Sequence, residues 1–304
     1  MTERVDLGRL GVWGHLDSLP IDEARAYARR VDELGFGTLW VAETAGREPF
    51  TLLGLLAGET HELNIGTSIV GIWGHDAQTA RMAAMTLQEA TAGRFVLGLG
   101  VSHLHLAQKL RGHTYERPLT RMKEFLAAYR AARYRGPMGD GASEPPVLVA
   151  ALREGMATLA ATDADGAFPY LVTPERVAWM RRLVDRAASD SRRDPPPLLA
   201  VTMPAVLDVD SDSARATARD YLAPYLQTPN YQASWHAQGF GESDWEAPAS
   251  DGLVDAMVAW GDVEALNSRV GELVSAGADH VAVIPLSPEG RTEHLPVLEA
   301  LARG

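Results

Sequence analysis

Short apolar runs alternate along the chain with amphipathic segments of helical spacing. A segment of helical spacing follows each apolar run, and in the first of them, residues 22–34, Ala24, Tyr27 and Val31 share one side. The apolar runs are apolar nearly throughout, as parallel strands are when both faces of their sheet are covered. They predict strands at residues 10–15, 38–43, 63–70, 95–100, 146–151, 166–171, 198–207 and 280–286. Eight strand–helix units predict an α/β fold, a single (β/α)8 TIM barrel over residues 1–304.

The rhythm is interrupted between the seventh and the eighth strand. Residues 225–252 are aromatic, rich in glycine and without a regular period, and helices are predicted after them near 252–260 and 262–276. Long insertions in compact domains tend to be functional. We therefore expect this insertion to form a lid or a wall of the active site, with a contact between subunits as the alternative.

An open, doubly wound sheet is the alternative fold. Its fingerprint is Gly-x-Gly-x-x-Gly after the first strand. In this chain Gly98 and Gly100 come at the fourth strand, and His103 occupies the position of the third glycine. The pattern therefore favours the closed barrel.

The charge and the cysteine content exclude several classes of function. The 304 residues carry a formal net charge of −12 and include no cysteine. Such a charge repels nucleic acid and anionic membranes, and the lack of cysteine excludes disulfides, thiolate metal sites and cysteine nucleophiles. The first residues lack an apolar signal core, and no apolar run approaches the roughly 20 residues of a membrane span. We expect a soluble cytoplasmic protein that acts on a small molecule.

Candidate site residues follow from the barrel, because its active site lies at the carboxyl ends of the strands. The residues at these positions are mostly apolar or aromatic, with few ionisable groups. They are Trp13, His15, Glu43, Thr44, Ser68 to His75, Gly100 to His105, Ala151 to Glu154 and Tyr170.

This set fits poorly with three common kinds of site. Metal ligands would have to come from His15, His75, His103 and Glu43, without His-x-His or His-Glu-x-x-His spacing. A glycosidase needs two carboxylates, and only Glu43 follows a strand; no Gly-x-Ser-x-Gly elbow is present. A cavity lined by tryptophan and glycine suits a planar aromatic cofactor that supplies its own chemistry.

Four segments carry a resemblance to a known family. They are LGFGTLWVAE (34–43), IGTSIVGIWGHDAQTAR (65–81), GRFVLGLGVSH (93–103) and ERPLTRMKEFL (116–126). They resemble the bacterial luciferase-like superfamily and, within it, the branch that uses the deazaflavin coenzyme F420. The resemblance implies a homodimeric oxidoreductase with coenzyme F420, and FMN is the alternative cofactor.

The resemblance also assigns residues to the cofactor. In deazaflavin members a non-proline cis peptide forms a bulge against the ring, which implies a cis bond at Ser68–Ile69. Gly98 and Gly100 would let the backbone approach the ligand closely, and Trp13, Trp40 and Trp73 should lie near the ring. The implied cofactor-binding residues are Trp13, Thr44, Thr67, Ser68, Ile69, Gly100, Val101, Ser102, Ala151, Leu152, Arg153 and Tyr170.

The phosphate and the glutamate tail of the deazaflavin are acidic. A chain with a net charge of −12 needs local cations or backbone N–H groups to bind them. The helix that begins after Arg153 would offer backbone N–H groups to the phosphate. For the glutamate tail of the deazaflavin, the candidate cations are Arg47, Arg111, Arg117 and Arg176.

The direction of the reaction follows from two departures from the family pattern. In its sugar-phosphate dehydrogenases a glutamate acid stands at the position of His103 and a histidine base at that of Thr44, and this chain has neither. We therefore expect a reductase that transfers hydride from the reduced cofactor to a C=C or C=N bond of a small organic substrate. The candidate proton donors are His103, Glu43, His75 or a bound water. The alternatives are an FMN-dependent monooxygenase and a barrel that binds cofactor without catalysis.

Overall fold

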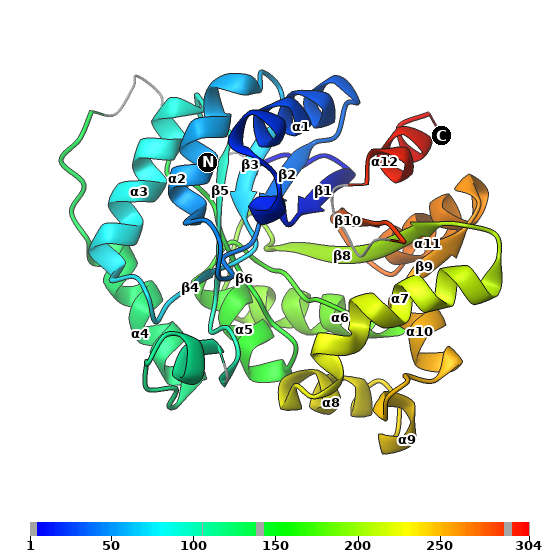
Figure 1. Ribbon diagram of the computed structural model, residues 1–304. Helices are drawn as coiled ribbons and strands as arrows, with labels where there is room; N and C mark the ends of the chain where they lie inside the picture. Colours follow the sequence, from blue (N-terminus) through cyan, green and yellow to red (C-terminus); the bar gives the residue numbers. More distant parts are fainter. Residues whose placement is uncertain (1–4, 105, 138–142, 289–293, 304) are drawn as a thin grey trace.

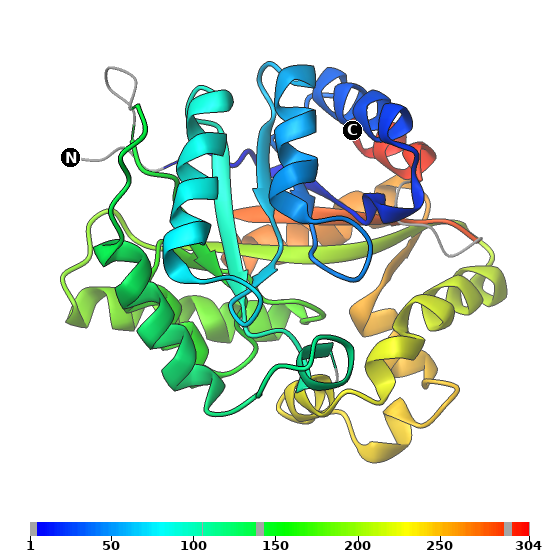
Figure 2. The same cartoon turned by 60° about the vertical axis from the view of Figure 1, so that its left-hand side comes forward.

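Parallel strands form a closed barrel in the computed structural model, which describes residues 5–104, 106–137, 143–288 and 294–303 (Figures 1 and 2). His105, one of the positions expected near the site, lies outside these ranges. The strands are neighbours in chain order, and β8 closes the ring by pairing with β10 over Ala200 to Val206. The barrel strands are β1 (Leu10–Gly14), β2 (Thr38–Val41), β3 (Asn64–Thr67) continued by β4 (Val70–Gly71), β5 (Phe95–Gly100), β6 (Val147–Val149), β7 (Gly166–Ala167), β8 (Leu198–Leu207) and β10 (His280–Leu286). The closure confirms the predicted barrel over the open sheet.

Helices surround the barrel and follow its strands in sequence. The surrounding helices are α1 (Ile21–Glu33), α2 (Pro49–Leu56), α3 (Ala77–Ala90), α4 (Pro118–Ala131), α5 (Glu154–Asp163), α6 (Pro174–Asp190), α7 (Ser211–Leu226), α11 (Val263–Ser275) and α12 (Leu295–Leu301). Three of these helices, α3, α6 and α11, begin with a side-chain cap, since Asp76, Thr173 and Asp262 each accept a hydrogen bond from a backbone N–H three residues on. None of the helices among the described residues is long and apolar enough to cross a bilayer.

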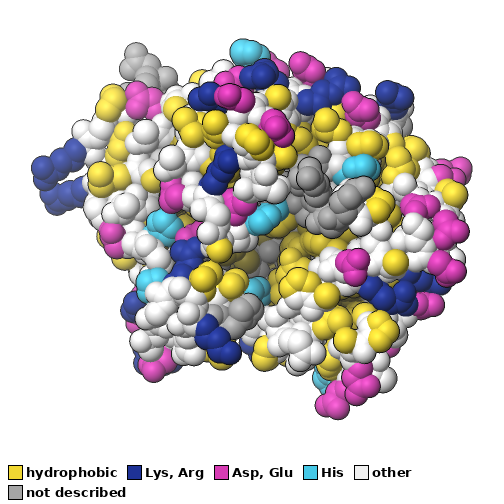
Figure 3. All heavy atoms as spheres, in the orientation of Figure 1, with side chains coloured by type: hydrophobic (Ala, Val, Ile, Leu, Met, Phe, Trp, Pro, Cys, Tyr) yellow, Lys and Arg dark blue, Asp and Glu magenta, His cyan; other side chains and the backbone are white. Residues whose placement is uncertain are grey.

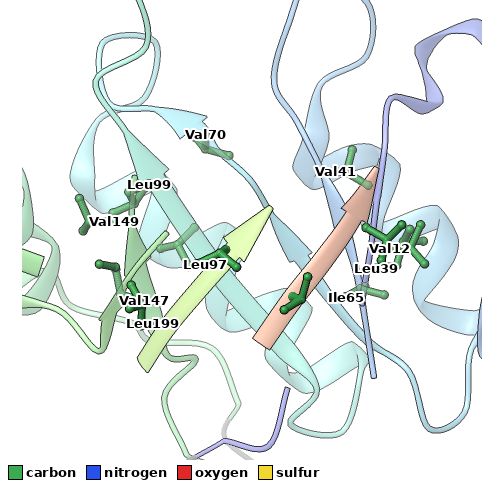
Figure 4. Packing of buried hydrophobic residues seen from close by; sticks show 14 of the residues in the cluster. Val12, Leu39, Val41, Ile65, Val70, Leu97, Leu99, Val147, Val149 and Leu199 are labelled. Atoms are coloured by element: carbon green, nitrogen blue, oxygen red, sulfur yellow. The ribbon is translucent and has the colours of Figure 1, made fainter. Parts of the chain in front are cut away.

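The two faces of each strand belong to different parts of the core. Figure 4 shows Val12, Leu39 and Ile65 together on neighbouring strands, within the cluster that packs the barrel against its helices. Side chains at the alternate positions of the strands fill the interior of the barrel. Trp40 is fully buried there, and its indole N–H donates to Nε2 of His280 at 2.9 Å. Burial lowers the pKa of His280 to about 4, so the neutral imidazole forms part of the barrel interior.

Five of the eight predicted strands, at 10–15, 38–43, 63–70, 146–151 and 166–171, are shorter or interrupted in the structure, and the residues that leave three of them matter for the site. Strand 63–70 is interrupted at Ser68 and Ile69 between β3 and β4. β6 and β7 end at Val149 and Ala167, so residues 150–151 and 168–170 leave the sheet and line a cavity.

The insertion is more ordered than its aperiodic sequence indicates. α7 continues to Leu226, and α8 (Pro229–His236) and α9 (Glu242–Trp245) follow within it. The helix predicted near 252–260 is wrong at its end. α10 (Asp251–Met257) stops before β9 (Ala259–Gly261), because Ala259 and Trp260 pair with the last residues of β8.

Candidate functional site

A cavity of about 400 Å³ opens at the carboxyl ends of the barrel strands. Figure 3 shows a group of hydrophobic side chains near the centre of this view, with charged side chains beside it and around it. The cavity walls come from the ends of the strands, from the loop after β5 and from the insertion. The predicted site residues that line it are Trp13, Glu43, Thr44, Ser68, Ile69, Val101, Ser102, His103, Ala151, Leu152, Arg153 and Tyr170.

Three predicted site residues lie behind this wall. Thr67 is fully buried, and its hydroxyl both donates to the Gly98 carbonyl and accepts from the Gly98 N–H, each at 2.8 Å. Gly100 is covered by the Ile69 side chain. His75 stands beside Glu43, with Nε2 at 3.4 Å from the nearer carboxylate oxygen. These residues support the wall and do not form its surface.

The peptide bond between Ser68 and Ile69 is cis, as the resemblance implies. The bulge is tied to the neighbouring strands, since the Trp13 indole N–H donates to the Ser68 carbonyl at 3.0 Å and the Glu43 N–H donates to the Ile69 carbonyl at 3.1 Å. A Cβ at Gly98 would lie 1.9 Å from the Thr67 carbonyl oxygen. The glycines of β5 therefore make room for the bulge, and protein fills the space that we expected a ligand to approach.

Glu43 is the most heavily bonded ionisable group of the cavity wall. One oxygen accepts from the Gly71 N–H at 2.6 Å, and the other accepts from Arg111 at 2.6 Å and faces His75. Burial raises the pKa of this carboxyl, but the hydrogen bonds from His75 and Gly71 and the charges of His75 and Arg111 outweigh it and leave the pKa below its ordinary value. The hydrogen bond with Glu43 in turn raises the pKa of His75. Glu43 is thus held ionised and has no proton to give.

Thr44 is oriented by two side chains from the segment after β1. Its hydroxyl donates to Asp17 at 2.7 Å and so accepts from Nε2 of His15 at 2.9 Å. Asp17 also accepts the backbone N–H groups of Gly46 and Arg47. The loop after β2 is therefore fixed in place beside the cavity.

The candidate cations for an acidic tail mostly have partners within the protein. Arg111 is bound to Glu43 and to the Thr44 carbonyl, and Arg47 donates to the Leu19 carbonyl. Arg117 is 71% exposed beside a glutamate of α4, and Arg176 donates to the Leu152 carbonyl at 2.8 Å.

Arg153 differs from these cations because its side chain lines the mouth of the cavity. It stands at the N-cap of α5, which has no side-chain cap, and Gly155 and Met156 of the first turn line the cavity as well, so first-turn N–H groups lie at the same region. Tyr115 and Asn230 line the mouth as well. Burial raises the pKa of Tyr115, against a hydrogen bond with Asn230 and the positive charge of Arg153. These groups form a donor-rich region suited to an anion.

Aromatic side chains form another part of the cavity wall. Tyr170 lies between Trp13 and Tyr231, with ring centroids 6.2 and 5.9 Å away, and its hydroxyl bonds those of Tyr221 and Tyr225. Burial raises the pKa of Tyr170 well above its ordinary value, so the phenol is neutral. Tyr225 and Tyr231 were missed by the sequence reasoning, although the aromatic content of the insertion was a signal. Their place on the wall supports the expected role of the first part of the insertion.

Residues 4–280 match the family of luciferase-like monooxygenases. The chain belongs to this family. It is 24% identical to a Mycobacterium tuberculosis protein provisionally named a coenzyme F420-dependent oxidoreductase, over 92% of this chain and 95% of that one. It is 23% identical to the 5,10-methylenetetrahydromethanopterin reductase of Methanolobus tindarius, over 88% and 92% of the two chains.

Solved structures of both cofactor classes share the fold of this luciferase-like protein. The F420-dependent tetrahydromethanopterin reductase of Methanopyrus kandleri superposes with a TM-score of 0.77 at 17% identity, over 97% of each chain. A type II Baeyer–Villiger monooxygenase component of Pseudomonas putida, solved with FMN, superposes with a TM-score of 0.74 at 14% identity, over 97% and 96% of the chains. At these identities the likeness concerns the fold.

Proposed function

We propose that this luciferase-like protein is a coenzyme F420-dependent oxidoreductase that reduces a C=C or C=N bond of a small neutral substrate. The observation that carries the proposal is the cavity, where a backbone bulge, an aromatic wall and a donor-rich mouth meet. The F420-dependent relatives, which span most of this chain, support the choice of cofactor. When bound, the reduced deazaflavin would supply the hydride.

The residues of the cavity fit a planar ring with an anionic side chain. Its volume of about 400 Å³ lies within the range of small-molecule sites. The bulge at Ser68 and Ile69 and the Trp13 side chain would hold the ring, with Val101 and Ser102 beside it. Arg153 and the N–H groups of α5 would bind the phosphate.

His103 is the best candidate to hold the transferred proton. Of the three predicted donors, Glu43 is held ionised by its partners, and His75 does not line the cavity. The His103 side chain lines the cavity, and its ring centroid lies 5.2 Å from that of Tyr231. This contact limits the orientation of the His103 ring. We infer that His103 donates a proton from a ring nitrogen to the reduced substrate.

A titration with each cofactor tests the proposal. Trp13 lines the cavity, whereas Trp40 is buried below it and Trp73 donates to the Val101 carbonyl, so Trp13 should report binding. We expect saturable, micromolar quenching of tryptophan fluorescence with coenzyme F420 and none with FMN. The quenching should largely disappear in Trp13→Phe and persist in Trp260→Phe, a site in β9.

An FMN-dependent monooxygenase is the second candidate, because an FMN-containing enzyme of the same fold aligns along nearly the whole chain. Saturation by FMN alone, with oxygen uptake in the presence of reduced FMN, would establish it and exclude the reductase. Binding of F420 without turnover on a panel of enones and imines would indicate a cofactor-binding barrel.

A further inference from the structure

Thr202 brings an unpaired hydroxyl to the cavity wall. It lies in the middle of β8, is 3% exposed and lines the cavity. Within residues 5–104, 106–137, 143–288 and 294–303, no group forms a hydrogen bond with its Oγ1. Buried hydroxyls are almost always hydrogen-bonded, because an unmet partner costs free energy. The hydroxyl of Thr38, equally buried in the same barrel, donates to the Leu7 carbonyl at 2.7 Å.

The cavity is the side from which a partner can reach Thr202. On its other sides Thr202 is surrounded by the packed barrel, and its paired residue on the neighbouring strand β10 is Ala282. Solvent does not reach Oγ1 in this conformation. A ligand atom that enters the cavity could therefore complete the hydrogen bond that the protein leaves open.

The strand order places Thr202 across the barrel from the bulge. Around the closed ring, β8 is four strands from β3 in either direction. A cofactor ring held against Ser68 and Ile69 would thus have Thr202 on its far side, where the substrate must lie. The charged residues that line the described cavity are Glu43 and Arg153. Glu43 is already bound by its partners, and Arg153 lies at the helix that would bind the phosphate.

We propose that Thr202 determines substrate specificity by hydrogen-bonding to a neutral carbonyl of the substrate. The proposal rests on the proposed function and adds a substrate class: an apolar α,β-unsaturated ketone, with its carbonyl oxygen at Thr202 and its C=C bond towards the bulge. The hydroxyl would donate to this oxygen, and the aromatic wall around Tyr170 and Tyr225 would enclose the apolar body.

Thermal shift and substrate binding test this role with three variants. Thr202→Val removes the hydroxyl at nearly constant shape, Thr202→Ser keeps it, and Thr38→Val is the matched control whose hydroxyl has a protein partner. Without ligand, Thr38→Val should melt about 2 °C below wild type, whereas Thr202→Val should melt no lower than wild type.

The ligand arm uses cyclohex-2-enone and, as a probe without the carbonyl, cyclohexene. We expect the Kd for cyclohex-2-enone to rise about tenfold in Thr202→Val and to stay within about twofold in Thr202→Ser. The Kd for cyclohexene and the Kd for coenzyme F420 should be unchanged in both variants.

Four results would overturn the role of Thr202. They are a wild-type protein without saturable binding of cyclohex-2-enone, unchanged enone binding in Thr202→Val, a loss of stability in Thr202→Val like that of Thr38→Val, and weaker F420 binding in Thr202→Val. A wild-type protein that fails to bind F420 would instead refute the proposed function. The enone and melting measurements do not need the cofactor, so the two failures are distinguishable.

Discussion

Glu43→Gln should destabilise the protein far more than an ordinary exchange of glutamate for glutamine. The side chain of Glu43 is 8% exposed and accepts from the Gly71 N–H, from Arg111 and from His75. Glutamine keeps the shape of the side chain but removes its charge. Its NH2 group replaces one carboxylate oxygen and cannot accept a hydrogen bond, so it faces the N–H groups of at least one of the three partners without bonding them. The substitution therefore loses charged hydrogen bonds and leaves a buried donor without an acceptor.

The magnitude follows from these three contacts. A hydrogen bond to a charged group contributes about 1.5–3 kcal/mol, but the Arg111 side chain is 33% exposed and water screens its share. We expect a loss of about 2–4 kcal/mol in the free energy of unfolding. An unfolding entropy of roughly 2.1 cal/mol/K per residue gives about 0.6 kcal/mol/K for this chain, so the melting temperature should fall by about 3–6 °C.

The pH dependence of this loss distinguishes the His75 contact from the others. The pKa of His75 is raised above 6.5, so its contribution is complete below pH 6.5 and disappears as the pH rises through the raised pKa. The pKa of Glu43 is lowered below 4.5, so its contribution is complete above pH 4.5 and disappears as the pH falls through the lowered pKa. The effect of Glu43→Gln should therefore be greatest between pH 4.5 and 6.5 and smaller in alkaline buffer.

Calorimetry of wild type, Glu43→Gln and the exposed control Glu62→Gln at pH 6 and pH 9 measures both effects. The control should melt with the wild type. A melting temperature of Glu43→Gln within 1 °C of wild type at pH 6 would refute the buried cluster. An equal loss at the two pH values would refute the part assigned to His75.

Three further predictions concern the interior, the loop after β5 and the cavity mouth. Because His280 is neutral in the fold with a pKa of about 4, wild-type stability in urea should fall as the pH drops from 6.5 to 4, and a flat profile would contradict its burial. Arg111→Met should increase amide hydrogen exchange several-fold in residues 106–110, since Arg111 bonds Glu43 and the Thr44 carbonyl; unchanged exchange would show that the loop does not need Arg111. Arg153→Gln should raise the Kd for coenzyme F420 about tenfold while Arg117→Gln leaves it within twofold, and equal effects would remove Arg153 from the phosphate site.

The barrel could be predicted because each strand is a continuous apolar run that ends at a turn signal. Boundaries were less predictable where tertiary contacts decide them. The run at 166–171 continues beyond β7, but Pro169 has no N–H to donate to a sheet, and the chain turns into the cavity. The run at 252–260 reads as a helix, yet Ala259 pairs with β8, a contact that no local pattern contains.

The site was predictable where the residues follow strands and unpredictable where distant residues meet. Glu43 could be placed at a strand end, which made it a candidate proton donor. Its ionisation depends mainly on His75 and on the Gly71 N–H, which lie on the next strand and the loop after it, and to a smaller extent on Arg111, 68 positions away. Tyr225 and Tyr231 lie in a segment without a period, so their approach to Tyr170 depends on how α7 and α8 pack.

The origins of the cavity walls indicate which part of the site sets specificity. The bulge at Ser68 and Ile69 is fixed by β1, β2 and β5, and the charge of Glu43 beside it is balanced within the protein. A change in these residues would disturb the barrel as well as the cofactor site. The walls of Tyr225 and Tyr231 come from helices outside the barrel, which can change without breaking its strands. Apart from the carbonyl contact proposed for Thr202, substrate preference should therefore be altered most readily by substitutions in α7 and α8, whereas substitutions at the bulge should alter cofactor binding and stability together.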